Sequence, residues 1–176
     1  MPVLLGILAA LGAVYFFVIR ARNAAEMTSD VLDAANDVRL AARRFGFRRQ
    51  AKRHPADTIE DPNIALAALG CAFVELDDLP TREQRLALTS GLGRVTRLDL
   101  DTVEELQTLG RWIMQECGSA QPAIARLARP LNKMQGAAGL ENLMELVQGV
   151  AKAGTGSLSP KQTDALDDIK RAFRIS

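Results

Sequence analysis

Side chains that carry out chemistry are scarce in this chain. His54 is the single histidine among 176 residues, and Cys71 and Cys117 are the two cysteines. The cysteines lie in separate helical apolar patterns, form no CxxC pair and have no basic neighbour in their helices, so we expect two buried thiols in a reducing compartment. Because an enzyme needs a nucleophile, a base or a metal, we expect no catalytic activity and no cofactor.

Aromatic residues are also few, at 5% of the chain, and runs of β-branched residues or strict apolar–polar alternation are rare. These absences argue against a sheet. The abundant residues are Ala, Leu, Arg, Glu and Asp, most of which favour helices. The sequence therefore predicts an all-α fold.

The net charge of +1 hides an uneven distribution. Residues 20–53 hold nine Lys/Arg against four Asp/Glu, a net +5, whereas residues 54–176 hold thirteen against seventeen, a net −4. A nucleic-acid-binding domain normally carries positive charge on its folded body. Because the body is acidic, we expect no nucleic-acid partner.

Residues 1–20 have the pattern of a transmembrane anchor. Pro2 to Ile19 is eighteen residues without a charge, about 27 Å as a helix, close to the roughly 30 Å of a hydrocarbon core. A cleaved signal peptide would need positive charge before the apolar stretch, but Arg20 and Arg22 follow it. We therefore expect a single span in a bacterial inner membrane, with the N-terminus outside and the C-terminal domain cytoplasmic.

A stripe of small residues, Gly6, Ala10 and Ala13, runs along one side of this predicted span. Small residues let two membrane helices approach closely, which predicts a homodimer or pairing with another span. Gly and Ala are common in membrane helices, so a lipid-facing anchor is an equal alternative.

Residues 21–53 are predicted to form a basic amphipathic juxtamembrane helix. Apolar residues recur at helical spacing from Met27 to Phe45, and Gly46 interrupts the pattern. A basic cluster next to a membrane feels the anionic leaflet at about 1 kcal/mol per residue, which predicts electrostatic docking; a topology determinant with a solvated face is the alternative. The predicted lipid-binding residues are Arg39, Arg43, Arg44, Arg48, Arg49, Lys52 and Arg53.

Residues 54–62 are polar, bracketed by prolines and without periodicity, which indicates a linker. Residues 63–176 then read as about six helices. Ile64 to Leu76 is apolar on nearly every side and is expected at the centre of the bundle. Pro130 is expected to end or kink its helix.

Three segments have the form of a capping box, in which two side chains satisfy backbone donors at a helix start. A separate stripe predicts the face that the helix after Gly139 buries. The predicted boxes are Thr81 with Gln84, Asp101 with Glu104, and Ser159 with Gln162, and the predicted stripe is Leu140, Leu143, Met144, Val147 and Ala151.

One pattern occurs twice, at residues 77–84 (DDLPTREQ) and 155–162 (TGSLSPKQ), and aligns Thr81 with Ser159 and Gln84 with Gln162. It resembles the duplicated turn of the TerB-like tellurite-resistance superfamily, which includes the membrane-proximal domain of the DjlA co-chaperones. The resemblance covers residues 62–174 and implies two similar helical hairpins, with a role in stress response. A J domain is not recognised in the sequence.

The TerB resemblance also implies divalent-metal sites made by acids at the turns, which carries over to Asp77 and Asp78. The sequence departs from the family pattern at Asp78, where glycine is usual, and at Thr155, where an acid is usual. A hard cation such as calcium takes six or more oxygen ligands, so solvated turn acids are the alternative.

Three functions remain open. The first is a membrane-tethered adaptor or scaffold that binds a protein partner at the inner membrane, with a link to envelope or metal stress. The second is a divalent-ion or small-ligand sensor that binds an ion or a small acid at the Asp77 turn. The third is an accessory subunit of a larger membrane complex.

Overall fold

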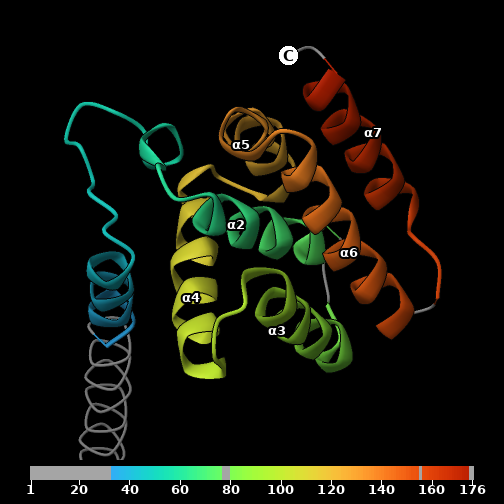
Figure 1. The fold of residues 1–176 in the computed structure, drawn as a ribbon, viewed down its shortest axis with the longest axis horizontal. Coiled ribbons are helices and arrows are strands. Elements are labelled where there is room, and N and C mark those ends of the chain that lie inside the picture. Colours follow the sequence, from blue (N-terminus) through green and yellow to red (C-terminus); the bar gives the residue numbers. More distant parts are fainter. Residues whose placement is uncertain (1–32, 77–79, 155, 175–176) are drawn as a thin grey trace, which may run out of the picture. The chain divides into compact units, whose positions relative to one another are not determined.

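A computed structural model describes residues 33–76, 80–154 and 156–174, and this part of the chain is helical without a strand (Figure 1). The all-α prediction is confirmed. The predicted span, with Gly6, Ala10 and Ala13, lies outside the described residues. Within the described ranges, no helix has the length and apolar character needed to cross a bilayer.

The chain divides into two compact units, residues 1–37 and 38–176. In the first unit, residues 33–37 are helical and exposed. In the second, the helix continues to residue 44. It is followed by η1 (Pro55–Thr58), α2 (Pro62–Glu75), α3 (Arg82–Thr96), α4 (Leu100–Glu116), α5 (Ala120–Gln135), α6 (Ala137–Ala153) and α7 (Pro160–Arg174). The six α-helices from α2 onward match the expected number.

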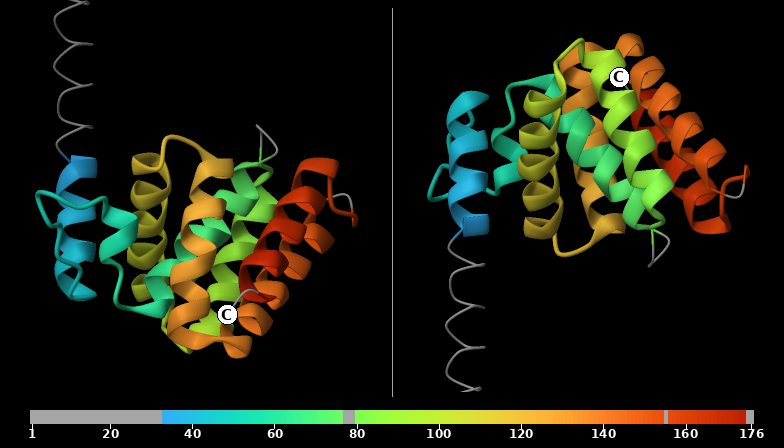
Figure 2. Two further views of the ribbon diagram at one scale, coloured as in Figure 1. Left: turned by 90° about the horizontal axis from the view of Figure 1, so that it is seen from above. Right: turned by 90° about the horizontal axis from the view of Figure 1, so that it is seen from below.

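Helix α2 is the centre of the second unit. Every residue from Ile64 to Val74 is buried, and α2 packs against α3, α4, α5 and α6 (Figures 1 and 2). A helix surrounded by other helices has no solvent-exposed side, which explains why the apolar residues of α2 show no preferred face. This confirms the prediction for this segment.

The α2 and α4 backbones approach closely at Gly110. A Cβ placed on Gly110 would lie 2.9 Å from both the carbonyl carbon of Ala67 and the backbone nitrogen of Ala68. Contact at this distance involves backbone atoms, so a rotamer change cannot relieve it. Small residues on both helices therefore fix how close α2 and α4 pack.

Two of the three predicted capping boxes are confirmed. Thr81 Oγ1 accepts from the Gln84 backbone N–H, while Gln84 Oε1 accepts from the Thr81 N–H. Ser159 and Gln162 repeat both bonds at the start of α7. The two similar turns of the sequence are thus similar helix starts.

The predicted box at Asp101 is wrong, because α4 begins at Leu100 and Asp99 caps it. Asp99 Oδ1 accepts from the Thr102 N–H at 3.0 Å, and Asp99 Oδ2 accepts from the Thr102 hydroxyl at 2.8 Å. Arg97 ends α3 with a left-handed backbone (φ 58°), and Asp99 then has the extended conformation of an N-cap residue.

Two further expectations need correction. Of the two effects expected at Pro130, ending the helix is wrong: α5 continues to Gln135, because a proline removes a single backbone donor and the buried face of α5 continues past it at Leu131. Helix α6 is rotated from the predicted stripe. Its buried residues are Gly139, Leu143, Leu146, Val147 and Val150, whereas Leu140, Met144 and Ala151 are half-buried.

We predict opposite effects for alanine at two helical glycines. Gly110→Ala should lower the free energy of unfolding by about 1–3 kcal/mol, the usual cost of overpacking. Gly149→Ala should raise it by about 0.5–1 kcal/mol, because a Cβ there meets no atom within 4 Å and alanine favours the helix. Urea unfolding followed by circular dichroism measures the free energy of unfolding of both variants. The same change in this free energy for Gly110→Ala and Gly149→Ala would contradict the close approach of α2 and α4.

Candidate functional site

Residues 38–54, here called the clasp, lie along α4 (Figures 1 and 2). The helical part of the clasp ends at residue 44, and Gly46, two residues later, has a positive φ of 65°. The Phe47 N–H donates to the Ala42 carbonyl, and the Gly46 N–H to the Arg43 carbonyl. This is a Schellman motif, in which glycine permits the left-handed turn. The turn directs Phe47 and the residues after it back over α4.

Apolar contacts attach the clasp to the body. Ala41 is completely buried, and Phe45 and Phe47 are partly buried against the core. The Phe47 ring meets the Trp112 ring edge-on, with 6.0 Å between centroids. Trp112 lies on α4 and is the only tryptophan of the chain, so its environment reports on this contact.

Two clasp arginines bind α4. Arg44 Nη1 donates to Glu105 Oε1 at 2.7 Å, and Arg44 Nη2 donates to the Thr102 hydroxyl at 2.6 Å. The Arg49 guanidinium lies 5.6 Å from the Trp112 ring centroid and 3.4 Å from Glu116 Oε2. Arg44 and Arg49 were both predicted to bind lipid, and in the structure both have protein partners.

The strength of these clasp contacts is modest. Exposed ion pairs contribute about 0–1 kcal/mol each, a cation–π contact about 0.5–1 kcal/mol and an aromatic pair about 0.5–1.5 kcal/mol. Two arginines near an anionic lipid surface would gain about 1 kcal/mol each. The free energy that the polar contacts of the clasp contribute is therefore of the same order as the free energy of attraction to such a surface.

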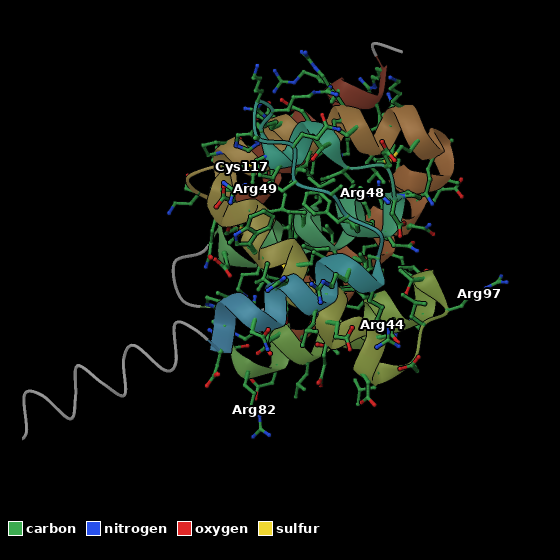
Figure 3. All side chains as sticks on the ribbon, turned by 90° about the vertical axis from the view of Figure 1, so that its left-hand side faces the viewer. Arg44, Arg48, Arg49, Arg82, Arg97 and Cys117 are labelled. Carbon is green, nitrogen blue, oxygen red and sulfur yellow. The ribbon has the colours of Figure 1, made fainter. Side chains whose placement is uncertain are left out.

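The other five predicted lipid-binding side chains are exposed and form no ion pair among the described residues. They are Arg39, Arg43, Arg48, Lys52 and Arg53. Figure 3 shows Arg44, Arg48 and Arg49 on the side of the molecule where the clasp covers α4, whereas Arg82 and Arg97 extend away from the body elsewhere. The predicted lipid-binding set thus divides into two arginines with protein partners and five side chains without an ion pair in the described ranges.

Residues 54–62, the predicted linker, are packed. Pro55, Ala56 and Thr58 of η1 are buried. His54 Nδ1 accepts from the Ala56 N–H, and His54 Nε2 lies 3.0 Å from the Glu116 carbonyl oxygen, an arrangement that the neutral tautomer with a proton on Nε2 satisfies. The segment connects the clasp to α2 and at the same time attaches it to the end of α4.

A bidentate ion pair attaches η1 to α5. Arg126 Nε donates to Asp57 Oδ1 at 2.9 Å, and Arg126 Nη2 donates to Asp57 Oδ2. These hydrogen bonds hold the pKa of the Asp57 carboxyl below its usual value. Both side chains are about two-fifths exposed, so solvent screens the pair.

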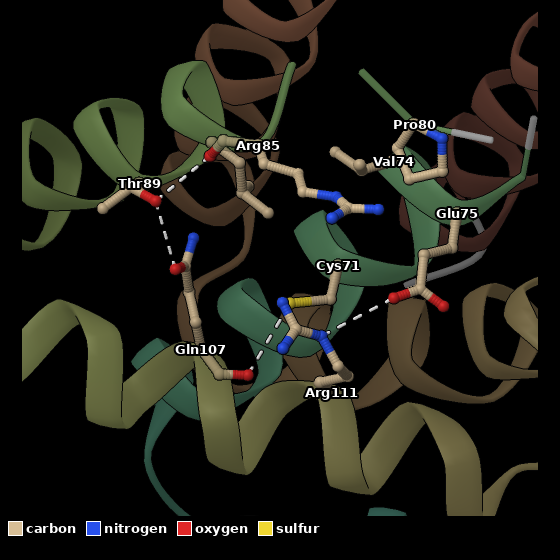
Figure 4. Close-up of a pocket in the computed structure, with 9 residues that line it drawn as sticks. Cys71, Val74, Glu75, Pro80, Arg85, Thr89, Gln107 and Arg111 are labelled. Carbon is tan, nitrogen blue, oxygen red and sulfur yellow. Dashed lines mark hydrogen bonds and ion pairs between the residues drawn. The ribbon is translucent and has the colours of Figure 1, made fainter. Parts of the chain in front are cut away.

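A second group of polar side chains surrounds a small pocket between α2, α3 and α4 (Figure 4). Its volume is about 50 Å³, and its polar lining includes Glu75, Arg85, Thr89, Gln107 and Arg111. Arg111 Nε lies 3.7 Å from Glu75 Oε1, whereas Arg85 forms no ion pair among the described residues.

The hydroxyl of Thr89 orders this pocket. It lies 3.1 Å from the Arg85 carbonyl oxygen and 3.1 Å from Gln107 Oε1. Because the Gln107 oxygen is used in this way, its amide N–H groups stay free to donate. Two guanidiniums and one amide against a single carboxylate make the lining suitable for a small anion.

Burial lowers the reactivity of the thiols. Burial raises the pKa of Cys71 to about 12, and a thiol that keeps its proton is unreactive. Burial also raises the pKa of Cys117, although this residue is only half-buried. Both cysteines are free, so the expectation of burial is confirmed for Cys71 and holds in part for Cys117.

The predicted metal candidates, Asp77 and Asp78, lie outside the described residues. In the described ranges, no three His, Cys, Asp or Glu side chains gather where they could hold a metal ion. Gly154, which ends α6, lies beside the start of α3, since a Cβ on Gly154 would lie 2.7 Å from Gln84 Nε2. The structure thus brings the start of α3 to the end of α6.

Comparisons with protein-family models, with curated proteins and with solved structures returned no match for this chain.

We predict that the Asp57–Arg126 pair stabilises the fold in a pH-dependent way. The folded-state pKa of Asp57 is below the ordinary value of 3.8. The stabilisation is therefore present above pH 3.8 and disappears as the pH falls through the lowered value. Asp57→Asn should lower the melting temperature at neutral pH, and the difference from wild type should shrink in acid.

Asp164→Asn is the control for this experiment, because Asp164 is exposed and has no ion pair in the described ranges. Thermal unfolding of the three proteins from pH 7 to pH 3 measures the effect. A difference between wild type and Asp57→Asn that persists unchanged into acid would contradict the assigned role of the ion pair.

Proposed function

We propose that this protein is a membrane-tethered adaptor of a bacterial inner membrane, whose cytoplasmic helical body binds a protein partner. The sequence of residues 1–20 supports the tether, and Arg20 and Arg22 support the orientation. Helix caps, other side chain–backbone bonds and surface ion pairs make up most of the side-chain polar contacts among the described residues. Such a body suits recognition of a partner better than catalysis.

One observation carries the proposal. The five basic side chains of the clasp that form no ion pair among the described residues occupy the stretch that follows the predicted span in sequence. Charges placed there attract an anionic lipid surface over a range limited by salt. We infer that Arg39, Arg43, Arg48, Lys52 and Arg53 dock the clasp to lipid, while Arg44 and Arg49 attach it to the body.

The full chain in nanodiscs tests this docking. Energy transfer from Trp112 to dansyl-labelled headgroups measures how near the body lies to lipid. We expect more transfer in discs with anionic lipid than in zwitterionic discs, and less at high salt. Replacing the five exposed clasp residues by glutamine should remove the difference between the two lipids.

The matched control removes five basic charges from the body instead, as Arg82→Gln, Arg97→Gln, Arg129→Gln, Lys133→Gln and Arg174→Gln combined. It should keep the lipid preference. Equal transfer in anionic and zwitterionic discs with the wild-type chain would rule out docking.

The pocket between α2, α3 and α4 favours a second candidate function, a small-ligand sensor. Glu75 and Pro80, which flank residues 77–79, line this pocket with Arg85 and Arg111. A carboxylate or phosphate group suits its size and its excess of donors. Binding there would stabilise the second unit.

Thermal unfolding with acetate or phosphate, against chloride at equal ionic strength, tests the sensor. A ligand at one hundred times its dissociation constant stabilises by about 2.7 kcal/mol, a rise of several degrees for a chain of this size. We expect Arg85→Gln to abolish the rise and Arg82→Gln, one turn away outside the pocket, to keep it. A rise with calcium or magnesium instead would favour metal binding at Asp77 and Asp78.

A further inference from the structure

Helix α4 carries two sets of side chains. Val103, Leu106, Leu109 and Ile113 are buried in the core. A second set, here called the clasp face, consists of Thr102, Glu105, Trp112 and Glu116. The steps of three, seven and four residues place these four on one side of the helix.

Each group of the clasp face has a partner of matching chemistry in the clasp. Glu105 and Thr102 accept from Arg44. The Trp112 ring contacts Phe47 and the Arg49 guanidinium. The face is therefore acidic at two points, aromatic between them, and complementary to a segment with two arginines and an aromatic residue.

Another segment could replace the clasp in its ion pairs with this face, because these ion pairs are exposed to solvent. In the Arg44–Glu105 pair the side chains are 46% and 39% exposed, and in the Arg49–Glu116 pair they are 64% and 31% exposed. Residues 50–53, which follow Arg49, are exposed and not helical. A competing segment can thus reach both ion pairs from solvent.

We propose that the clasp face is the partner-binding surface of the adaptor and that the chain's own clasp occupies it. The partner that it fits is a basic segment in which an aromatic residue lies between two arginines about five positions apart, as in residues 44–49 (RFGFRR). This inference rests on the proposed adaptor function and names its binding site. A partner binds by taking the place of Arg44, Phe47 and Arg49.

A peptide of residues 38–54, labelled with a fluorophore, tests this surface. It is added to the full chain in zwitterionic nanodiscs, where lipid charge does not attract it. In the wild type the clasp competes with the peptide. In Arg44→Gln/Phe47→Ala/Arg49→Gln the face is vacated, and we expect the peptide to bind at least tenfold more tightly, as measured by fluorescence anisotropy.

Two controls assign this binding to the clasp face. Arg43→Gln/Arg48→Gln removes the same charge from clasp residues without ion pairs in the described ranges, and should bind the peptide as weakly as the wild type. Adding Glu105→Gln/Glu116→Gln to the vacated variant should abolish binding. Equal peptide affinity for the vacated variant and the wild type would overturn the proposal, as would binding that survives loss of both glutamates.

Far-UV circular dichroism checks that each variant keeps its helix content. If the triple variant unfolds, Arg44→Gln/Arg49→Gln, which keeps the Phe47–Trp112 contact, replaces it, with the same tenfold expectation and the same overturning result. The experiment contains no anionic lipid. If the peptide does not bind the vacated variant more tightly but the lipid preference in the nanodisc experiment is preserved, the proposed partner surface is wrong and the proposed membrane docking still holds.

Discussion

The close approach of α2 and α4 is the constraint on which the rest of the second unit depends. Gly110 lets the backbone of α4 meet that of α2 at Ala67 and Ala68, so one side of α4 is used completely in the core. The clasp contacts α4 at Glu105, Trp112 and Glu116, and the position of these side chains follows from how α2 and α4 pack.

Local features were predictable from the sequence because they depend on neighbours in the chain. The all-round apolar pattern of α2 predicted its burial, and the boxes at Thr81 and Ser159 predicted two helix starts. The predicted capping box at Asp101 was wrong because Asp99 is an equally good N-cap. The choice between them depends on the backbone at Arg97, which ends α3 in a left-handed conformation that its residue type does not suggest.

The candidate site was less predictable, because it depends on contacts between distant parts of the chain. Arg44 and Arg49 have the same chemistry as the exposed arginines beside them. What distinguishes them is the position of α4, some sixty residues later in sequence. The acid–aromatic–acid spacing of Glu105, Trp112 and Glu116 was the available signal, but an apolar pattern alone does not show which outward side of a helix receives another segment.

The single histidine connects the junction between the clasp and α2 to the end of α4. Neutral His54 accepts a hydrogen bond through Nδ1 from Ala56 and lies close to the Glu116 carbonyl oxygen through Nε2. His54 is therefore the N-cap of η1 and at the same time a neighbour of the last residue of α4. Because the Glu116 side chain also receives Arg49, one residue contacts both ends of residues 49–54, through its backbone and its side chain together.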